Sequence, residues 1–191
     1  MYYSPSKNGF YDKALTKLLP TDAVEISDDT HQNLLSEQAK GKRLVSTSSG
    51  KPIALGQYER HVDGVVVHDV EAELVDLLRQ KCANINKACK DAIESGFVSG
   101  ALGSTYKYDS ELEDQLNLSG NIQLGIDVKH RCADSNGNKT FRLHTAEQIR
   151  LVGEDMAAHK ISCLEKSNAL KEQANAAASA KDLDLLKGIK W

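Results

Sequence analysis

The chain has 191 residues and carries 24 Lys and Arg against 27 Asp and Glu, which gives a formal net charge of −3. Such a balance provides no broad positive field for phosphate groups, so nucleic acid is not expected as the main partner. No apolar run approaches the roughly 18 residues of a membrane helix, and no basic stretch followed by an apolar one opens the chain. We therefore expect a protein that is neither inserted in a membrane nor exported.

Proline marks a change of character along the chain. All three prolines, Pro5, Pro20 and Pro52, lie early in the sequence, and proline is disfavoured inside helices because it lacks an N–H and clashes with the preceding turn. The sequence thus predicts an α+β protein, with a small N-terminal module of short hairpins and one helix and a mostly helical C-terminal module with a β-hairpin. The expected limits are residues 1–56 for the first module, 57–70 for a joint and 71–191 for the second module.

Three elements are predicted in the N-terminal module. Tyr2–Tyr11 should form two short strands around the turn-forming Pro5–Gly9, because β-favouring aromatic residues flank that turn. A helix should begin after Ser27, whose side chain can cap it, and end before Gly41. A second hairpin is predicted over residues 43–55, around a polar loop that ends in glycine.

The joint is open to two interpretations. Asp63-Gly64 lies between Val62 and a run of valines. This arrangement is typical of a tight hairpin turn, but it is equally compatible with a linker punctuated by glycine. The module boundary is expected within this segment.

The C-terminal module is predicted to open with its most regular helix. Over Glu71–Ser95 apolar residues recur at steps of three and four, which is typical of a helix with one buried face, and Gly96 can end it. We expect this apolar stripe to pack within the module rather than against a partner helix. The stripe consists of Leu74, Leu77, Leu78, Cys82, Ile85, Cys89, Ala92 and Ile93.

Shorter elements should follow this helix. Residues 106–108 are predicted to form a strand, and residues 111–124 a helix that Gly120 weakens. Asn136-Gly137 is a strong hairpin signal between two β-favouring runs, over residues 128–143.

The last long helix is predicted from a capping sequence at its N-terminus. Thr145 and Gln148 match a capping box, in which each residue bonds to the backbone of the other. The helix should continue into an alanine-rich stretch, before a short segment that begins at Asp182 and the final Trp191.

The sequence contains no recognisable catalytic, metal or redox motif. The four cysteines include no C-x-x-C pair, and the six histidines show no metal-ligating spacing. No nucleophile elbow, phosphate-binding loop or dinucleotide fingerprint is present. We therefore expect reduced cysteines, no cofactor, no metal and no enzymatic activity. The cysteines are Cys82, Cys89, Cys132 and Cys163.

One segment imitates part of a calcium loop. Asp134, Asn136 and Asn138 match the first, third and fifth ligands of such a loop. However, Lys139 stands where the loop needs glycine, and Thr145 where it needs a bidentate glutamate. We therefore interpret the segment as a hairpin turn.

Six short segments of the N-terminal module occur in an order that carries a family resemblance. They are Tyr2–Pro5, Gly9–Asp12, Asp22–Ser27, His31–Leu35, Gly41–Val45 and Gly50–Pro52. In content and order they resemble the start of the tail-fibre assembly (Tfa-type) proteins of tailed bacteriophages.

The rest of the chain, from about Val70, looks like an uncharacterised domain that often follows such modules in phage tail-associated proteins. The likeness rests on the leading helix, Tyr106–Asp109, Asn121, the hairpin before Thr145 and the closing Leu186–Trp191. The chain departs from the common pattern because no proline-rich linker separates the modules, which suggests a stiffer joint.

The resemblance implies a chaperone that binds the C-terminal tip of a trimeric phage tail fibre and promotes its folding and trimerisation. Such a protein works in the cytoplasm of the infected bacterium, and some relatives stay on the fibre tip of the virion. Self-association is compatible with this role. One alternative is a permanent structural component or receptor-binding adhesin at the fibre tip, and another is a phage-encoded α+β protein with neither role.

Aromatic residues gather at the N-terminus, where Tyr2, Tyr3, Phe10 and Tyr11 lie within the first eleven residues. Aromatic side chains dominate protein interfaces because each desolvates a large area at small entropic cost. We hypothesise that part of this cluster, with Pro5 and the turn that follows it, contacts the fibre. The alternative is that these aromatics form the core of the module, since a strand buries one of its faces.

Overall fold

The structure is a computed structural model that describes residues 1–191. It is a mixed α/β structure, 47% helical and 22% strand, with several small sheets. Contacts between Cα atoms divide the chain into two compact units, Met1–Glu73 and Leu74–Trp191.

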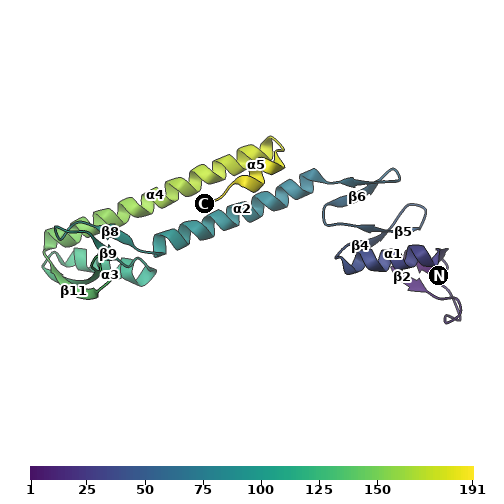
Figure 1. Cartoon of the computed structure of the whole chain (residues 1–191), viewed down its shortest axis with the longest axis horizontal. Coiled ribbons are helices and arrows are strands. Elements are labelled where there is room, and N and C mark those ends of the chain that lie inside the picture. Colours follow the sequence, from purple (N-terminus) through teal and green to yellow (C-terminus); the bar gives the residue numbers. More distant parts are fainter. The chain divides into compact units, whose positions relative to one another are not determined.

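The helices and strands are labelled in chain order in Figure 1. The strands are β1 (Tyr2–Ser4), β2 (Gly9–Tyr11), β3 (Val24–Glu25), β4 (Arg43–Ser46), β5 (Pro52–Leu55), β6 (Glu59–Val62), β7 (Val65–His68), β8 (Phe97–Ser99), β9 (Tyr106–Tyr108), β10 (Val128–Ala133) and β11 (Lys139–His144). The helices are α1 (Asp28–Ala39), α2 (Val70–Glu94), α3 (Leu112–Leu124), α4 (Ala146–Ser179) and α5 (Leu183–Gly188).

The first unit begins with a three-stranded sheet in the order β2-β1-β3. β1 and β2 form the predicted hairpin, with Tyr3 opposite Phe10. Asn8 in the turn has a φ of 46°, a left-handed conformation that asparagine tolerates better than most residues. The sequence does not predict β3, which pairs with the other edge of β1, because two residues carry no periodic signal.

The predicted helix after Ser27 is confirmed as α1. The Ser27 Oγ accepts a hydrogen bond from the Thr30 N–H at 3.1 Å, and the acidic Asp28 and Asp29 occupy the first turn. The helix ends just before Gly41, whose φ of 90° glycine adopts without strain. Within the unit it packs against β4 and β5.

Two further hairpins complete the first unit. β4 and β5 pair as predicted. β6 and β7 pair with Val62 opposite Val65, and Asp63 and Gly64 turn between them with φ values of 50° and 88°. Two successive left-handed residues are typical of the tight turn that suits the twist of a hairpin, so the segment left open by the sequence is a hairpin.

The long helices α2 and α4 lie side by side in the second unit (Figure 1), where the Cys89 Sγ is 3.5 Å from the Cys163 carbonyl oxygen. The Lys81 ammonium on α2 donates to the carbonyl oxygens of Lys187 at 2.6 Å and Ile189 at 2.8 Å, which holds the C-terminal segment against α2. Residues of the predicted stripe therefore pack within the unit, as expected. The apolar cluster between α2, α4 and α5 consists of Leu74, Ile85, Ala174, Ala177, Leu186 and Ile189.

A four-stranded antiparallel sheet in the order β11-β10-β9-β8 lies with α3 at one end of the two long helices (Figure 1). The hairpin β10–β11, the strand β9 and the helix α3 are confirmed as predicted. The sequence does not predict β8, because its three residues become a strand only through pairing with β9. The predicted hairpin is therefore half of a larger sheet rather than an isolated pair of strands.

The core at this end of the unit joins the sheet to α3 and α4. α4 begins with the predicted capping box, in which the Thr145 Oγ1 accepts the Gln148 N–H at 3.2 Å and the Gln148 Oε1 accepts the Thr145 N–H at 2.9 Å. This start places Ile149 and Val152 on the buried face. The core consists of Phe97, Tyr108, Leu118, Cys132, Ile149 and Val152.

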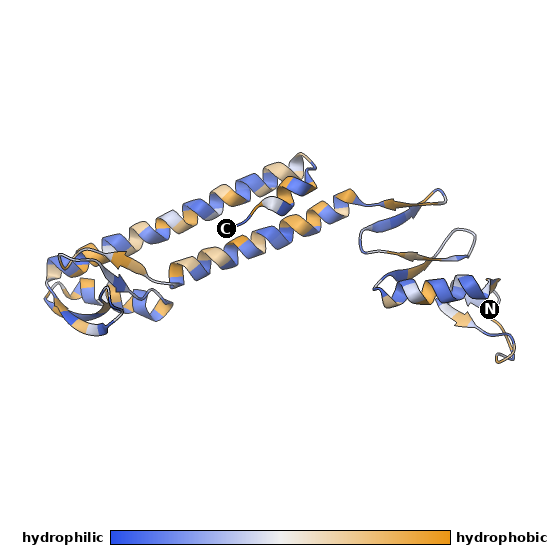
Figure 2. Ribbon diagram, viewed as in Figure 1, coloured by the Kyte–Doolittle hydropathy of each residue, from blue (hydrophilic) through white to orange (hydrophobic).

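Polar and apolar residues are interspersed along α2 and α4 (Figure 2). That pattern suits helices that bury one face against neighbouring elements. None of the helices combines the length with the apolar character that crossing a membrane requires.

Gly96 lies at the junction between α2 and β8, where a substitution can test the packing. Its φ is 93°, and a Cβ atom there would lie 2.6 Å from the Tyr108 carbonyl oxygen. Gly96→Ala should therefore lower the free energy of unfolding of the second unit by about 1–3 kcal/mol, measured by urea denaturation. Gly100→Ala is the matched control, because nothing lies within 4 Å of the methyl group added there. An equal loss in both variants would contradict this explanation.

Candidate functional site

The five residues predicted to contact a partner lie on the hairpin β1–β2 and its turn, but they differ in exposure. Tyr3 is fully buried, at 0% relative exposure, whereas Tyr2, Pro5, Phe10 and Tyr11 are half-buried. A fully buried side chain cannot touch a partner without rearrangement of the fold. Tyr3 is therefore a core residue, whereas the other four side chains remain partly accessible to solvent.

Tyr3 links three parts of the first unit. Its hydroxyl donates to the Asn8 Oδ1 at 2.7 Å and lies 3.1 Å from the Ser46 Oγ on β4. Its ring centroid lies 5.4 Å from that of Phe10, with the two rings tilted. These contacts satisfy the buried hydroxyl while they hold the turn and connect the hairpin to β4.

Phe10 lies at the border between core and surface. Its ring meets the ring of His31 on α1 edge to face, with centroids 4.6 Å apart. β2, which carries Phe10, is an outer strand of its sheet and pairs only with β1. The hairpin thus presents a partly exposed aromatic ring on an edge strand, whose other edge pairs with no strand.

Asp22 clamps the turn of the hairpin from the segment that precedes β3. Its Oδ1 accepts the Ser4 hydroxyl at 2.7 Å, and its Oδ2 accepts the Ser6 backbone N–H at 2.6 Å. Both bonds favour the charged form, so the pKa of Asp22 lies below its ordinary value, with the Ser4 bond as the largest cause. The clamp therefore operates at neutral pH.

The loop after β2 exposes two leucines that the sequence does not single out. Leu15 is 85% exposed and Leu18 is 87% exposed. Asp12 holds the start of this loop, because its Oδ1 accepts the Ala14 N–H at 2.8 Å and its carbonyl oxygen accepts the Thr16 N–H at 2.9 Å. A loop has no periodicity that separates exposed from buried leucines, so sequence reasoning misses them. We call the following residues the N-terminal apolar set: Tyr2, Phe10, Tyr11, Leu15 and Leu18.

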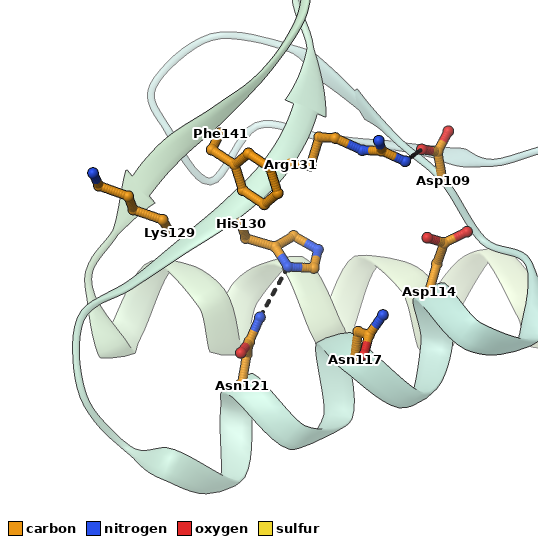
Figure 3. Close-up of a pocket in the computed structure, with 8 residues that line it drawn as sticks. All are labelled: Asp109, Asp114, Asn117, Asn121, Lys129, His130, Arg131 and Phe141. Carbon is orange, nitrogen blue, oxygen red and sulfur yellow. Dashed lines mark hydrogen bonds and ion pairs between the residues drawn. The ribbon is translucent and has the colours of Figure 1, made fainter.

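The second unit contains a pocket of about 270 Å³ between α3 and the hairpin β10–β11 (Figure 3). His130 points toward α3, where the Asn121 Nδ2 is 3.0 Å from the His130 Nδ1. Sequence reasoning assigns no site role to the lining, although Asp109 and Asn121 belong to the resemblance of residues 70–191. The lining consists of Asp114, Asn117 and Asn121 from α3, Lys129, His130 and Arg131 from β10, and Asp109 and Phe141.

Tyr108 and two histidines form a network in the same unit. The Tyr108 hydroxyl lies 2.9 Å from the His144 Nε2, and the His144 Nδ1 lies 2.9 Å from the Arg142 carbonyl oxygen. His144 therefore donates from Nδ1 and accepts the tyrosine proton at Nε2. The His130 ring stacks on Tyr108 with centroids 6.0 Å apart. Burial raises the pKa of Tyr108 and lowers the pKa of both histidines, so all three are neutral at pH 7.

The structure describes the four cysteines and the segment that imitates a calcium loop. All four cysteines are free, and burial raises the pKa of Cys132 and Cys163, which disfavours the reactive thiolate. The Asp134 Oδ1 accepts the N–H groups of Asn136 and Asn138, both at 2.9 Å. The segment is a hairpin turn held by its own aspartate, as predicted. No group of three or more His, Cys, Asp or Glu side chains in the structure could hold a metal ion.

The Asp22 clamp predicts that the hairpin turn is sensitive to acid. Because the folded pKa is lowered, the clamp stabilises the turn fully above the ordinary aspartate pKa of about 4 and is lost as the pH falls through the lowered value. Asp22→Asn should imitate the acid form, so the Ser6 amide should exchange faster with solvent in NMR measurements at neutral pH. Asp29→Asn, on the exposed first turn of α1, is the control. Unchanged exchange in Asp22→Asn would contradict the clamp.

Because the pKa values of His130 and His144 are lowered, we expect the second unit to become less stable in mild acid. Their folded pKa values lie below the ordinary 6.5, so the unfolded chain binds protons first as the pH falls. The free energy of unfolding of the second unit should therefore be greatest above about pH 6.5 and decrease below it. Urea denaturation at several pH values measures this, and His144→Gln should flatten the profile. A flat profile in the unmodified chain would refute the assignment of neutral histidines.

Comparison with known proteins identifies a family for the second unit. Residues 76–186, more than half of the chain, match a family described as a domain of unknown function (DUF4376). The matched residues include the four-stranded sheet, α3, α4 and the pocket lining. No curated protein and no solved structure matches the chain. The chain therefore belongs to the DUF4376 family.

Proposed function

We propose that this protein is a bacteriophage tail-fibre assembly chaperone, which binds the C-terminal tip of a trimeric tail fibre and promotes the folding and trimerisation of that fibre. It acts by binding alone, without enzymatic activity or a cofactor, in the cytoplasm of the infected bacterium, and it can stay on the mature fibre. The observation that carries the proposal is the N-terminal apolar set, in which half-buried aromatics precede Leu15 and Leu18, 85% and 87% exposed.

The family resemblance of the N-terminal module coincides with the framework around this set. Tyr2–Pro5 and Gly9–Asp12 include β1 and β2, and Asp22–Ser27 includes the clamp, β3 and the cap of α1. The segments that resemble tail-fibre assembly proteins therefore include Ser4 and Asp22, whose hydrogen bond is part of the clamp on the aromatic hairpin. This overlap supports the proposal that this module binds a fibre as tail-fibre assembly proteins do.

The proposal includes the division into two modules. We take residues 1–56 as a fibre-binding module of short hairpins and one helix, 57–70 as a joint, and 71–191 as a mostly helical module with a β-hairpin. The two compact units, Met1–Glu73 and Leu74–Trp191, support a division in this part of the chain.

A chaperone would help a trimeric fibre because such a fibre folds slowly and can aggregate before it is complete. Strands interwound between three chains depend on non-local contacts, which form slowly and leave strand edges open to aggregation. β2 pairs with one neighbour only, so its free edge offers backbone groups to a strand of the unfinished tip. The N-terminal apolar set would cover apolar surface of the tip until the trimer closes.

Co-expression with the C-terminal part of the neighbouring fibre gene tests the proposal. The fibre segment should become a soluble trimer with this chain and should aggregate without it, as followed by size-exclusion chromatography. If the segment trimerises equally well alone, the chaperone role is lost. Co-purification with mature virions then distinguishes a helper that leaves from a permanent component or adhesin at the tip.

The exposed leucines give a sharper test within that assay. The double variant Leu15→Ser/Leu18→Ser should fold normally, because both side chains are exposed, yet bind the fibre segment at least about tenfold more weakly by calorimetry. Leu112→Ser/Leu116→Ser is the matched control, since these leucines of α3 are 67% and 64% exposed. Equal weakening in both double variants would contradict a contact through the N-terminal apolar set. Tyr3 is unsuitable as a probe because its loss would disturb the core.

A further inference from the structure

The pocket between α3 and the hairpin β10–β11 has no part in the proposed function (Figure 3). Its volume of about 270 Å³ is slightly below the roughly 300–1,000 Å³ that is typical of small-molecule sites. A ligand that fills it is therefore small. Its chemistry follows from three properties of the lining, which are charge, hydrogen-bonding groups and apolar surface.

The formal charges of the lining cancel. Asp109 and Asp114 supply two negative charges, and Lys129 and Arg131 supply two positive ones. The Arg131 guanidinium lies 3.5 Å from the Asp109 carboxylate. Burial lowers the pKa of His130, which keeps this ring uncharged at pH 7. The Lys139 ammonium, which is not part of the lining, also lies 2.7 Å from the Asp109 carboxylate. The lining itself has no net formal charge, so we expect an uncharged ligand, with phosphate as the charged competitor.

Donors and acceptors occur together among the uncharged groups. The Asn121 Nδ2 donates to the His130 Nδ1 at 3.0 Å, which leaves the Asn121 Oδ1 as an acceptor and the His130 Nε2–H as a donor. Asn117 forms no bond to the other lining residues in Figure 3, and its amide offers both a donor and an acceptor. Hydroxyl groups donate and accept at once, so a ligand with several hydroxyls can use all of these groups.

Phe141 adds a flat apolar surface to this polar lining. Its side chain is 68% exposed although it lines the pocket. The face of a pyranose ring that carries C–H bonds is the apolar surface that a polyhydroxylated molecule can place on an aromatic ring. Leu143, two residues along β11 and 60% exposed, does not line the pocket.

We propose that this pocket is a saccharide site that binds one sugar ring of an uncharged glycan. The ring stacks on Phe141, and its hydroxyls bond to the Asn117 amide, the Asn121 Oδ1 and the His130 Nε2–H. The Asp114 Oδ2 accepts the Glu111 N–H at 3.2 Å within the cap of α3, so its Oδ1 accepts from a further hydroxyl. This site is independent of the chaperone role, and failure of either proposal leaves the other standing.

NMR titration of the whole chain with glucose, galactose, mannose, N-acetylglucosamine and lactose tests the site. At least one of these sugars should shift the side-chain amide signals of Asn117 and Asn121 in a saturable way, with a Kd on the order of 1 mM. No saturable shift with any of them would overturn the proposal. Tighter binding of inorganic phosphate at the same residues would overturn it too.

Three variants separate this site from the surface around it. Phe141→Ala and Asn117→Ala should each lower the affinity for the bound sugar by about tenfold or more. Leu143→Ala, on the same face of β11, is the matched control and should bind as the unmodified chain does. All three side chains are exposed, so thermal unfolding should be unchanged. Unchanged affinity in Phe141→Ala and Asn117→Ala, or an equal loss in Leu143→Ala, would overturn the proposal.

Discussion

The Tyr108 side chain on β9 contacts all three of the other strands of the sheet in the second unit. Its ring stacks with Phe97 on β8 at 5.5 Å and with His130 on β10 at 6.0 Å, and its hydroxyl bonds to His144 on β11. The residue is 1% exposed, so an unpaired hydroxyl there would cost about 1–3 kcal/mol. The bond to His144 removes that cost only when the strands are in their observed register, which is why the sheet depends on this tyrosine.

The same constraint positions the pocket. The His130 ring is held from one element by stacking on Tyr108 and from another by the Asn121 amide of α3. Its free Nε2–H is therefore fixed before any ligand arrives, which lowers the entropic cost of binding. One imidazole ring thus links core packing to the proposed saccharide site.

The first unit uses a tyrosine in a comparable way. Tyr3 is buried with its hydroxyl bonded to Asn8 and Ser46, while Phe10, Leu15 and Leu18 keep apolar surface exposed. The exposed groups of the first unit are apolar, whereas the pocket of the second unit has a mostly polar lining. Exposed apolar side chains suit a protein partner, because they gain free energy by leaving water. A charge-balanced polar lining suits a small hydroxylated ligand.

Much of the secondary structure could be predicted because its signals are local. Ser27, the pair Thr145 and Gln148, and Asn136-Gly137 act on backbone groups within a few residues, and the stripe over residues 71–95 repeats with the helical period. The strand β8 could not be predicted in this way. Its three residues have no pattern of their own and become a strand only when Tyr106–Tyr108 lies beside them.

The sequence by itself determined where most helices and hairpins begin and end, and that aromatics gather at the N-terminus. Tertiary structure decided which of them are buried. Tyr3 and Phe10 lie opposite each other on paired strands, yet only Tyr3 is fully buried. Only the fold likewise brings Asn121, His130 and Phe141 together, because burial and pocket lining depend on which distant segments pack against a residue, and neighbours in the chain do not encode that.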